Sequence, residues 1–171
     1  MKPQSGREEH KAGAPRRLRV AVLTVSDTRS EATDASGAYL TQELSAAGHE
    51  VSARAIVRDD PEAIAGALNA WIEAKVASAI LCTGGTGIGR RDGTINVVEA
   101  LLDTPLPGFG ELFRMLSYPE VGAAAMLSRA TAGVSRGVLV FALPGSLNAV
   151  KTAWEKLLRD ELGHVVHELT R

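Results

Sequence analysis

The sequence has little of what several classes of protein require. Its one cysteine, Cys82, has no partner for an internal disulfide, which favours a reducing, cytoplasmic setting. No apolar run approaches the roughly 18 residues of a membrane-spanning helix, and the N-terminal segment lacks the apolar core of a signal peptide. Aromatic residues make up 4% and the formal net charge is −1, so we expect neither nucleic acid nor a membrane as a partner.

What is present is typical of a single globular domain. Hydrophobic residues account for 45% of the 171 residues and charged residues for 23%. A chain of this length can bury a full hydrophobic core. Residues 1–17 are polar and charged with almost no apolar side chain to bury, so they are predicted to form a disordered tail. Residues 18–171 are predicted to form one domain.

Short apolar runs alternate with helical patterns along this domain. The first three predicted strands span residues 18–25, 51–57 and 76–82, and each is followed by apolar residues at helical spacing. The helix after the first strand is predicted to start at Asp34. After a helix break at residues 103–108, two further helices are predicted at residues 109–116 and 119–127. A strand pair at residues 128–134 and 137–142 and a long final helix capped by Ser146 complete the chain. This alternation predicts a three-layer α/β/α fold with a mostly parallel central sheet.

A glycine-rich segment, residues 83–94 (TGGTGIGRRDGT), joins the third predicted strand to a helix. Ligands of open α/β sheets bind at the carboxyl ends of strands. Small residues let a ligand approach the backbone, whose N–H groups, together with the helix N-terminus, favour an anion. Arg90 and Arg91 suit phosphate, and Asp92 offers an oxygen ligand for magnesium. The segment therefore predicts a phosphate-bearing ligand with a divalent metal nearby.

Two familiar phosphate-binding motifs do not fit this segment. A P-loop has the span from Gly84 to Gly89, but it needs lysine and then serine or threonine where Arg90 and Arg91 stand. A dinucleotide fingerprint that began at Gly85 and Gly87 would need glycine at position 90. A glycine turn required only for tight packing remains the alternative interpretation.

Further carboxylates follow the first two predicted strands. Asp27 either faces the ligand or bonds to its own backbone, and the sequence leaves both possibilities open. Asp60 is a good helix N-cap because Pro61 occupies the first helical position. This leaves Asp59 without an evident structural role, and it becomes a second candidate carboxylate beside Asp92.

Six motifs in this order resemble the MogA and MoaB family of molybdenum cofactor biosynthesis proteins. The similarity covers residues 18–165, and the segments 109–117 (FGELFRMLS) and 127–133 (LSRATAG) are closer to MoaB. The motifs are VSDT at 25–28, DASG at 34–37, TGGTG at 83–87, PGFGE at 107–111, SR at 128–129 and LPGS at 143–146.

The resemblance implies a molybdopterin-binding fold that assembles as a trimer or a dimer of trimers. The implied ligand is molybdopterin, a dithiolene pterin that ends in a phosphate. MogA-like members transfer AMP from MgATP to that phosphate and release pyrophosphate. They pass the product to a MoeA-like protein that inserts molybdate.

The same resemblance assigns roles to individual residues. Asp59 and Asp92 would serve catalysis by holding Mg²⁺ and orienting the triphosphate. Arg129 is interpreted as a structural residue buried against a helix end. The residues expected to bind the pterin and the phosphates are Ser26, Asp27, Gly84, Gly85, Thr86, Gly87, Ser128 and Ser146.

The sequence departs from the family at one place. Adenylylating relatives commonly continue after the aspartate with Thr-Pro and an acidic residue, whereas this chain has Thr94-Ile95-Asn96. The amide removes a charge expected near the metal, which leaves open a MoaB-like protein that binds molybdopterin without transferring AMP. A nucleotide-pyrophosphatase domain like that of the CinA group is a third interpretation, disfavoured by the lack of a second domain and by the MoaB-like helix after Gly108.

Overall fold

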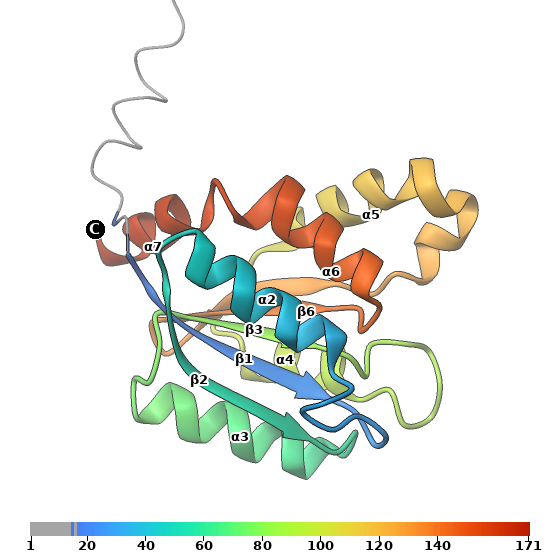
Figure 1. The fold of residues 1–171 in the computed structure, drawn as a ribbon, viewed down its shortest axis with the longest axis horizontal. Coiled ribbons are helices and arrows are strands. Elements are labelled where there is room, and N and C mark those ends of the chain that lie inside the picture. The colour runs from blue at the N-terminus through green and yellow to red at the C-terminus, as the bar shows by residue number, and fades with distance from the viewer. Residues whose placement is uncertain (1–14, 16) are drawn as a thin grey trace, which may run out of the picture.

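A six-stranded sheet forms the middle layer of the computed structural model, which describes residues 15 and 17–171 (Figure 1). The strand order is β2-β1-β3-β6-β5-β4. Helices cover both faces, so the predicted three-layer fold with a mostly parallel sheet is confirmed. The predicted tail, residues 1–17, lies almost entirely outside the described residues and stays a prediction.

Four parallel strands carry the site. They are β1 (Arg19–Val25), β2 (Glu50–Val57), β3 (Ala79–Thr83) and β6 (Val138–Leu143). Two antiparallel strands, β5 (Thr131–Ser135) and β4 (Thr104–Pro105), extend the sheet beyond β6. Every residue of β3 and β6 is buried because both faces of the sheet are covered, which explains their continuous apolar runs.

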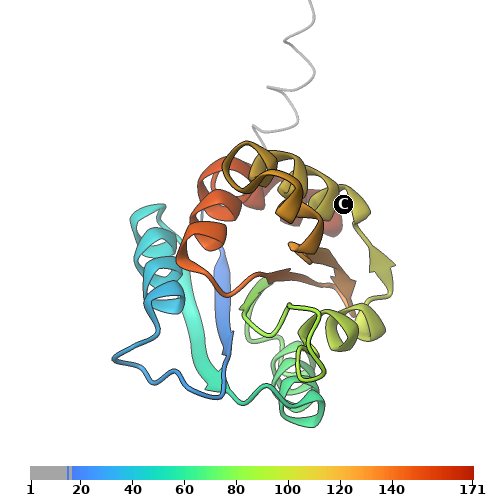
Figure 2. The same ribbon diagram turned by 90° about the vertical axis from the view of Figure 1, so that its right-hand side faces the viewer.

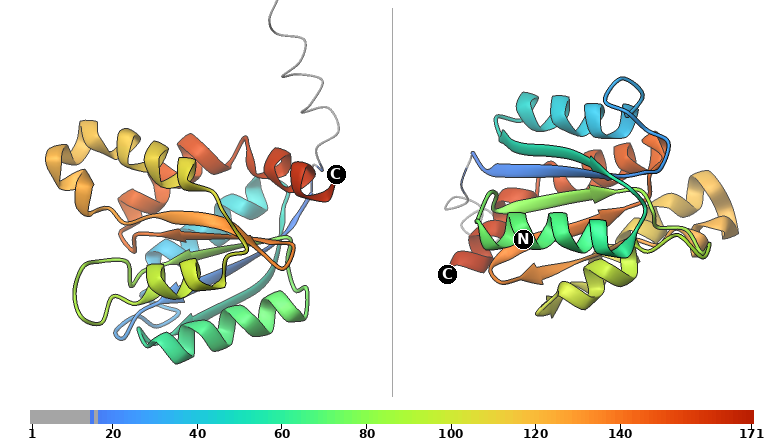
Figure 3. Two further views of the ribbon diagram at one scale, coloured as in Figure 1. Left: turned by 180° about the vertical axis from the view of Figure 1, so that it is seen from behind. Right: turned by 90° about the horizontal axis from the view of Figure 1, so that it is seen from below.

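The two faces of the sheet carry different helices (Figure 2). On one face, α2 (Ala35–Ala46), α5 (Pro107–Val121), α6 (Leu147–Ala153) and α7 (Leu162–Thr170) contribute buried residues such as Leu40, Phe113 and Val150 to one core cluster. On the other face, α3 (Pro61–Glu73) and α4 (Thr94–Leu101) contribute Ile64, Leu68 and Val98 to a second cluster. Figure 3 shows α3 and α4 together beneath the sheet.

Three predicted helix starts are confirmed with their capping hydrogen bonds. Asp34 accepts from the Gly37 backbone N–H at 2.9 Å and starts α2. Asp60 accepts from Ala63 N–H at 2.9 Å and starts α3, with Pro61 at the first helical position. Ser146 accepts from Ala149 N–H at 3.2 Å and starts α6. These side chains satisfy backbone donors that a helix start leaves unpaired.

The C-terminal helical segment departs from the prediction of one long helix. A π-helical turn, Trp154–Leu158, follows α6, and α7 begins only at Leu162. A π-helix has more residues per turn than an α-helix. Both Trp154 and Leu158 are buried in the core.

Two other segments differ from prediction. The helix expected at residues 119–127 is divided between the end of α5 and a 3₁₀ segment, Gly122–Leu127, where Gly122 has a φ of 60°. The segment after Asp103, predicted only as a helix break, contains β4. A strand of two residues is too short to give a period-2 pattern in the sequence.

The sheet topology places a crevice between β1 and β3. From β1 the chain moves to β2 on one side, whereas β3 lies on the other side of β1. Such a topological switch point opens a crevice at the carboxyl ends of the two strands. Of the helices in the described part of the chain, none combines the length and the apolar character needed to cross a membrane.

Candidate functional site

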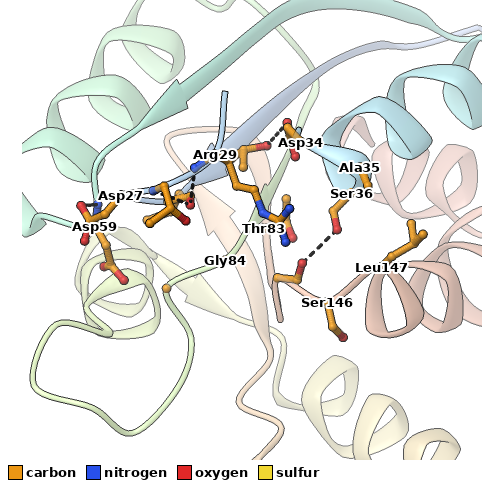
Figure 4. A pocket seen from close by; sticks show the side chains of 16 residues that line it. Asp27, Arg29, Asp34, Ala35, Ser36, Asp59, Thr83, Gly84, Ser146 and Leu147 are labelled. Carbon is orange, nitrogen blue, oxygen red and sulfur yellow. Dashed lines mark hydrogen bonds between the residues drawn. The ribbon is translucent and has the colours of Figure 1, made fainter. Parts of the chain in front are cut away.

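A cavity of about 430 Å³ opens at the carboxyl ends of β1, β3 and β6, where the topology predicts a crevice (Figure 4). We call it the switch-point cavity. Its lining includes Ser26 and Arg29 after β1, Ser36 of α2, Gly84 after β3 and Ser146 after β6. Figure 4 shows Asp27 and Asp59 at one end of this cavity and Ser36, Ser146 and Leu147 at the other.

Gly84 allows two strand ends to meet at the floor of the cavity. Its φ is 96°, and a Cβ atom on it would overlap the carbonyl oxygen of Val25. Its N–H donates to the Leu143 carbonyl at 3.1 Å, which joins the end of β3 to the end of β6. For this residue the packing interpretation of the glycine-rich segment holds, because no side chain fits there.

Gly85 and Gly87 leave space for two carboxylates. A Cβ on Gly85 would lie 2.9 Å from Asp59 Oδ1, and a Cβ on Gly87 would lie 2.6 Å from Asp92 Oδ2. The Asp92 Oδ2 atom accepts from Gly89 N–H at 2.7 Å, which holds it against the loop. The fold thus brings Asp59 and Asp92, the two predicted catalytic residues, to one loop.

Asp59 has a structural role that the sequence did not reveal. Its Oδ1 atom accepts from the Gly93 N–H at 3.4 Å, immediately before α4. A carboxylate at a helix N-terminus is favoured by the unpaired N–H groups and by the helix dipole. The hydrogen bond fixes Asp59 against the far end of the glycine-rich segment.

Asp27 contacts two other segments, the loop after β2 that contains Asp59 and the glycine-rich segment. Its Oδ1 accepts from the Asp59 backbone N–H at 3.2 Å, and its Oδ2 pairs with Arg91 Nη2 at 2.9 Å. The local turn is stabilised instead by Ser26, whose Oγ accepts from the Thr28 and Arg29 backbone N–H groups. Of the two possibilities left open by the sequence, Asp27 therefore contacts other segments and lines the cavity.

The surroundings raise the pKa of the Asp59 carboxyl above its usual value. Burial is the largest cause, and the negative charges of Asp92 and Asp27 add to it. The Gly93 N–H and the Arg91 guanidinium act in the opposite direction. Crowded carboxylates of this kind are costly without a cation, and they are common at functional sites.

Six of the ten predicted site residues line the switch-point cavity: Ser26, Asp27, Asp59, Gly84, Gly85 and Ser146. The other four, Thr86, Gly87, Asp92 and Ser128, are not part of its lining. Thr86 is buried within the loop, and Gly87 and Asp92 lie farther along it. Ser128 follows the 3₁₀ segment that ends at Leu127. The predicted binding roles of these four residues stay predictions.

Comparisons with known proteins agree with this architecture. A family model described as "Probable molybdopterin binding domain" matches residues 21–164. The chain belongs to this family. It is 49% identical to a Bacillus cereus protein named "Molybdenum cofactor biosynthesis protein B", over 95% of this chain and 97% of that one.

Solved structures give the same result. One titled "Crystal structure of Molybdenum cofactor biosynthesis protein B" is 49% identical, with a TM-score of 0.89, and the match covers 92% of this chain and 99% of that one. The tungsten cofactor synthesizing protein MoaB from Pyrococcus furiosus is 43% identical, with a TM-score of 0.83, over 92% and 100% of the two chains. The fold expected from the resemblance is therefore confirmed.

Arg129, interpreted from the sequence as buried against a helix end, instead reaches the glycine-rich segment. It is partly exposed, its Nη1 donates to the Gly87 carbonyl at 3.0 Å, and its Nη2 donates to Asn96 Oδ1 at 2.8 Å. Its place in the family motif Ser128-Arg129 was the signal that could have identified it. Since Asn96 bonds to Arg129, an acidic residue at this position would form an ion pair with that arginine.

Magnesium, which the resemblance to the family led us to expect, needs oxygen ligands. Within residues 15 and 17–171, no three histidine, cysteine, aspartate or glutamate side chains gather into a metal-binding group. Magnesium keeps several waters and is commonly bound by one or two carboxylates together with substrate phosphates. Two loop-facing carboxylates, Asp59 and Asp92, fit this pattern.

We expect Asp59→Asn to leave the melting temperature at pH 7 equal or higher. The raised pKa means that ionising Asp59 disfavours the native state, so its stabilising contribution is present below the unfolded-state pKa and is lost as pH rises through the native pKa. Asparagine can still accept the Gly93 hydrogen bond. Thermal unfolding should be measured for both proteins at pH values from 7 down into the acid range. Any excess of the Asp59→Asn melting temperature over the wild-type value should disappear at the pH where Asp59 is protonated.

Asp60→Asn is the matched control for this measurement. Asparagine caps helices about as well as aspartate, so this neighbouring change should have little effect on stability. A melting temperature of Asp59→Asn clearly below that of the wild type at pH 7 would contradict the account of Asp59.

Proposed function

We propose that the protein binds molybdopterin in the switch-point cavity and transfers AMP from MgATP to its terminal phosphate. The observation that carries this proposal is the pair of carboxylates, Asp59 and Asp92, held against a side-chain-free glycine loop beside the cavity. The names of the relatives, which concern molybdenum cofactor biosynthesis, supply the identity of the pterin.

The polar lining of the switch-point cavity suits a pterin with an anionic tail. Ser36 and Ser146 provide hydroxyl groups at the end away from Asp27 and Asp59. Arg29 donates through Nη1 to the Thr33 carbonyl at 3.0 Å, which holds its guanidinium over the cavity with other N–H groups available to a phosphate. Backbone N–H groups and hydroxyls can pair with the many donors and acceptors of a pterin ring.

The chemistry needs positioning more than a strong base. An oxygen of the molybdopterin phosphate is already anionic, and it forms the new bond to the α-phosphorus of ATP. The bond from that phosphorus to the oxygen bridging the β-phosphate breaks, and pyrophosphate leaves with the electron pair. Asp59 and Asp92 would hold the magnesium ion, which neutralises phosphate charge. Arg129, through Gly87, would keep the loop in place.

The test is a turnover assay with purified protein, MgATP and molybdopterin that follows both pyrophosphate and adenylylated molybdopterin. We expect AMP transfer by the wild type and a loss of at least about a hundredfold in Asp92→Asn, because a metal-holding charge is removed. Molybdopterin binding should remain. Binding without transfer by the wild type would favour the alternative, a non-catalytic molybdopterin-binding protein that delivers the pterin to a MoeA-like partner.

We also propose that the protein assembles as a trimer through α5 and the 3₁₀ segment after it. This part of the chain extends past the end of the sheet (Figures 1 and 3). It exposes an apolar patch that consists of Leu112, Met115, Tyr118, Val121, Met126 and Leu127. An apolar groove beside Leu112, lined by Phe109, Leu157 and Val165, continues this surface. Large apolar side chains that are exposed together on one segment commonly mark an interface.

Introducing a charge into the patch should dissociate the oligomer. The side chain of Met115 is 59% exposed, so the variant Met115→Glu would place a carboxylate in the interface. Light scattering after size exclusion should give a trimer for the wild type and a monomer for the variant. Ala70→Glu, on the exposed side of α3 on the opposite face of the sheet, should remain trimeric. A monomeric wild type would refute the assembly.

A further inference from the structure

A second cavity, of about 610 Å³, lies next to the switch-point cavity, and Asp59 lines both. Its lining includes Arg58 and Asp60 after β2, and Arg90 and Arg91 from the glycine-rich segment. We call it the arginine cavity. The loops that follow β2 and β3 thus bring three guanidinium groups to one cavity.

The charges of the two cavities differ. The arginine cavity combines three arginines with Asp59 and Asp60, and Asp60 is engaged as the N-cap of α3. Arg91 pairs with Asp27, while Arg58 and Arg90 form no ion pair with any residue that the structure describes. The switch-point cavity contains one arginine, Arg29, together with Asp27, which pairs with Arg91, Asp34, which pairs with Arg54 at 3.0 Å, and Asp59. A highly charged polyphosphate is therefore favoured in the arginine cavity.

We infer that the arginine cavity binds the β- and γ-phosphates of ATP and holds them as the departing pyrophosphate. This inference rests on the proposed function and assigns a place to the half of the nucleotide that is not transferred. The α-phosphate lies at the shared wall formed by Asp59, with Asp92 beside it on the loop. Molybdopterin approaches it from the switch-point cavity.

The arrangement of the two cavities matches the requirement of the reaction. In phosphoryl-type transfer, the attacking and leaving oxygens lie roughly in line on opposite sides of the phosphorus. In the proposed arrangement, the acceptor and the leaving group occupy separate cavities that share Asp59. The guanidinium groups of Arg58 and Arg90 stabilise the negative charge that develops on the leaving pyrophosphate.

The ion pair between Asp27 and Arg91 connects the two cavities. Asp27 lines the switch-point cavity, Arg91 lines the arginine cavity, and their side chains meet at 2.9 Å. Asp27 also accepts from the backbone N–H of Asp59. This contact fixes one wall of the arginine cavity relative to the carboxylate that both cavities share.

The test measures calorimetric binding of magnesium pyrophosphate and of α,β-methylene-ATP with magnesium to the full chain. We expect Arg58→Ala and Arg90→Ala each to weaken both affinities by about tenfold or more, since each removes charge-assisted hydrogen bonds. Molybdopterin affinity should be unchanged in both variants. Arg29→Ala should show the reverse pattern, with weakened molybdopterin binding and retained pyrophosphate binding.

Arg159→Ala removes an exposed arginine that pairs only with its neighbour Asp160 in the described structure, and it should change none of these affinities. Melting temperatures near the wild-type value would show that the variants are folded. If pyrophosphate affinity survives in Arg58→Ala and Arg90→Ala but is lost in Arg29→Ala, the polyphosphate binds in the switch-point cavity and the inference is overturned.

The same variants separate this inference from the proposed function. Arginine-dependent binding of pyrophosphate without any AMP transfer would support the polyphosphate site and refute the transferase activity. Undiminished AMP transfer, with an unchanged KM for ATP in Arg58→Ala and Arg90→Ala, would support the transferase and overturn the polyphosphate site.

Discussion

The site depends on the close approach of two carboxylates to a backbone that has no side chains. Asp59 reaches the loop at Gly85, and Asp92 folds back onto it at Gly87, at distances that a methyl group would not allow. Burial raises the pKa of the Asp59 carboxyl, and the negative charges of Asp92 and Asp27 raise it further. The native packing of the strands, the Gly93 hydrogen bond and the Asp27–Arg91 pair offset this repulsion and hold the carboxylates where a cation would join them.

The sheet topology explains why these groups meet. The parallel strands β1, β2, β3 and β6 end at the same edge of the sheet. The strands β2 and β3 lie on opposite sides of β1, which makes this edge a topological switch point. Hydroxyl-bearing loops from one side and arginine-bearing loops from the other then border the same aspartate. The proposed transfer between two anionic substrates uses this arrangement, in which the carboxylate of Asp59 lines both cavities.

The sequence allows the strands, the caps and the glycine loop to be predicted because these features are local. The apolar run of β3, the capping side chains of Asp34, Asp60 and Ser146, and the small residues of the loop each act on their immediate neighbours. The sequence pattern also singled out Asp59 and Asp92 as candidate carboxylates, and the resemblance to the MogA and MoaB family added their catalytic roles. The π-helical turn was missed because its buried residues Trp154 and Leu158, four positions apart, would also share one side of an α-helix.

The contacts that join distant segments could not be predicted. Arg129 bonds to Gly87 and Asn96, which lie 42 and 33 positions away, and Asp59 bonds to Gly93, which lies 34 positions away. The arginine cavity likewise combines Arg58 with Arg90 and Arg91. No periodicity records such partners, since they depend on how the loops after β2 and β3 lie together in the folded chain.

The most direct measurement is the affinity for Mn²⁺ in the presence of α,β-methylene-ATP, by electron paramagnetic resonance, for Gly87→Ala and Gly66→Ala. Gly87 does not have a positive φ, so its new Cβ acts through Asp92 alone, whereas Gly66 in α3 has open space around it. The account predicts weakened Mn²⁺ binding only in Gly87→Ala, with both variants folded. Wild-type affinity in a folded Gly87→Ala variant would contradict it.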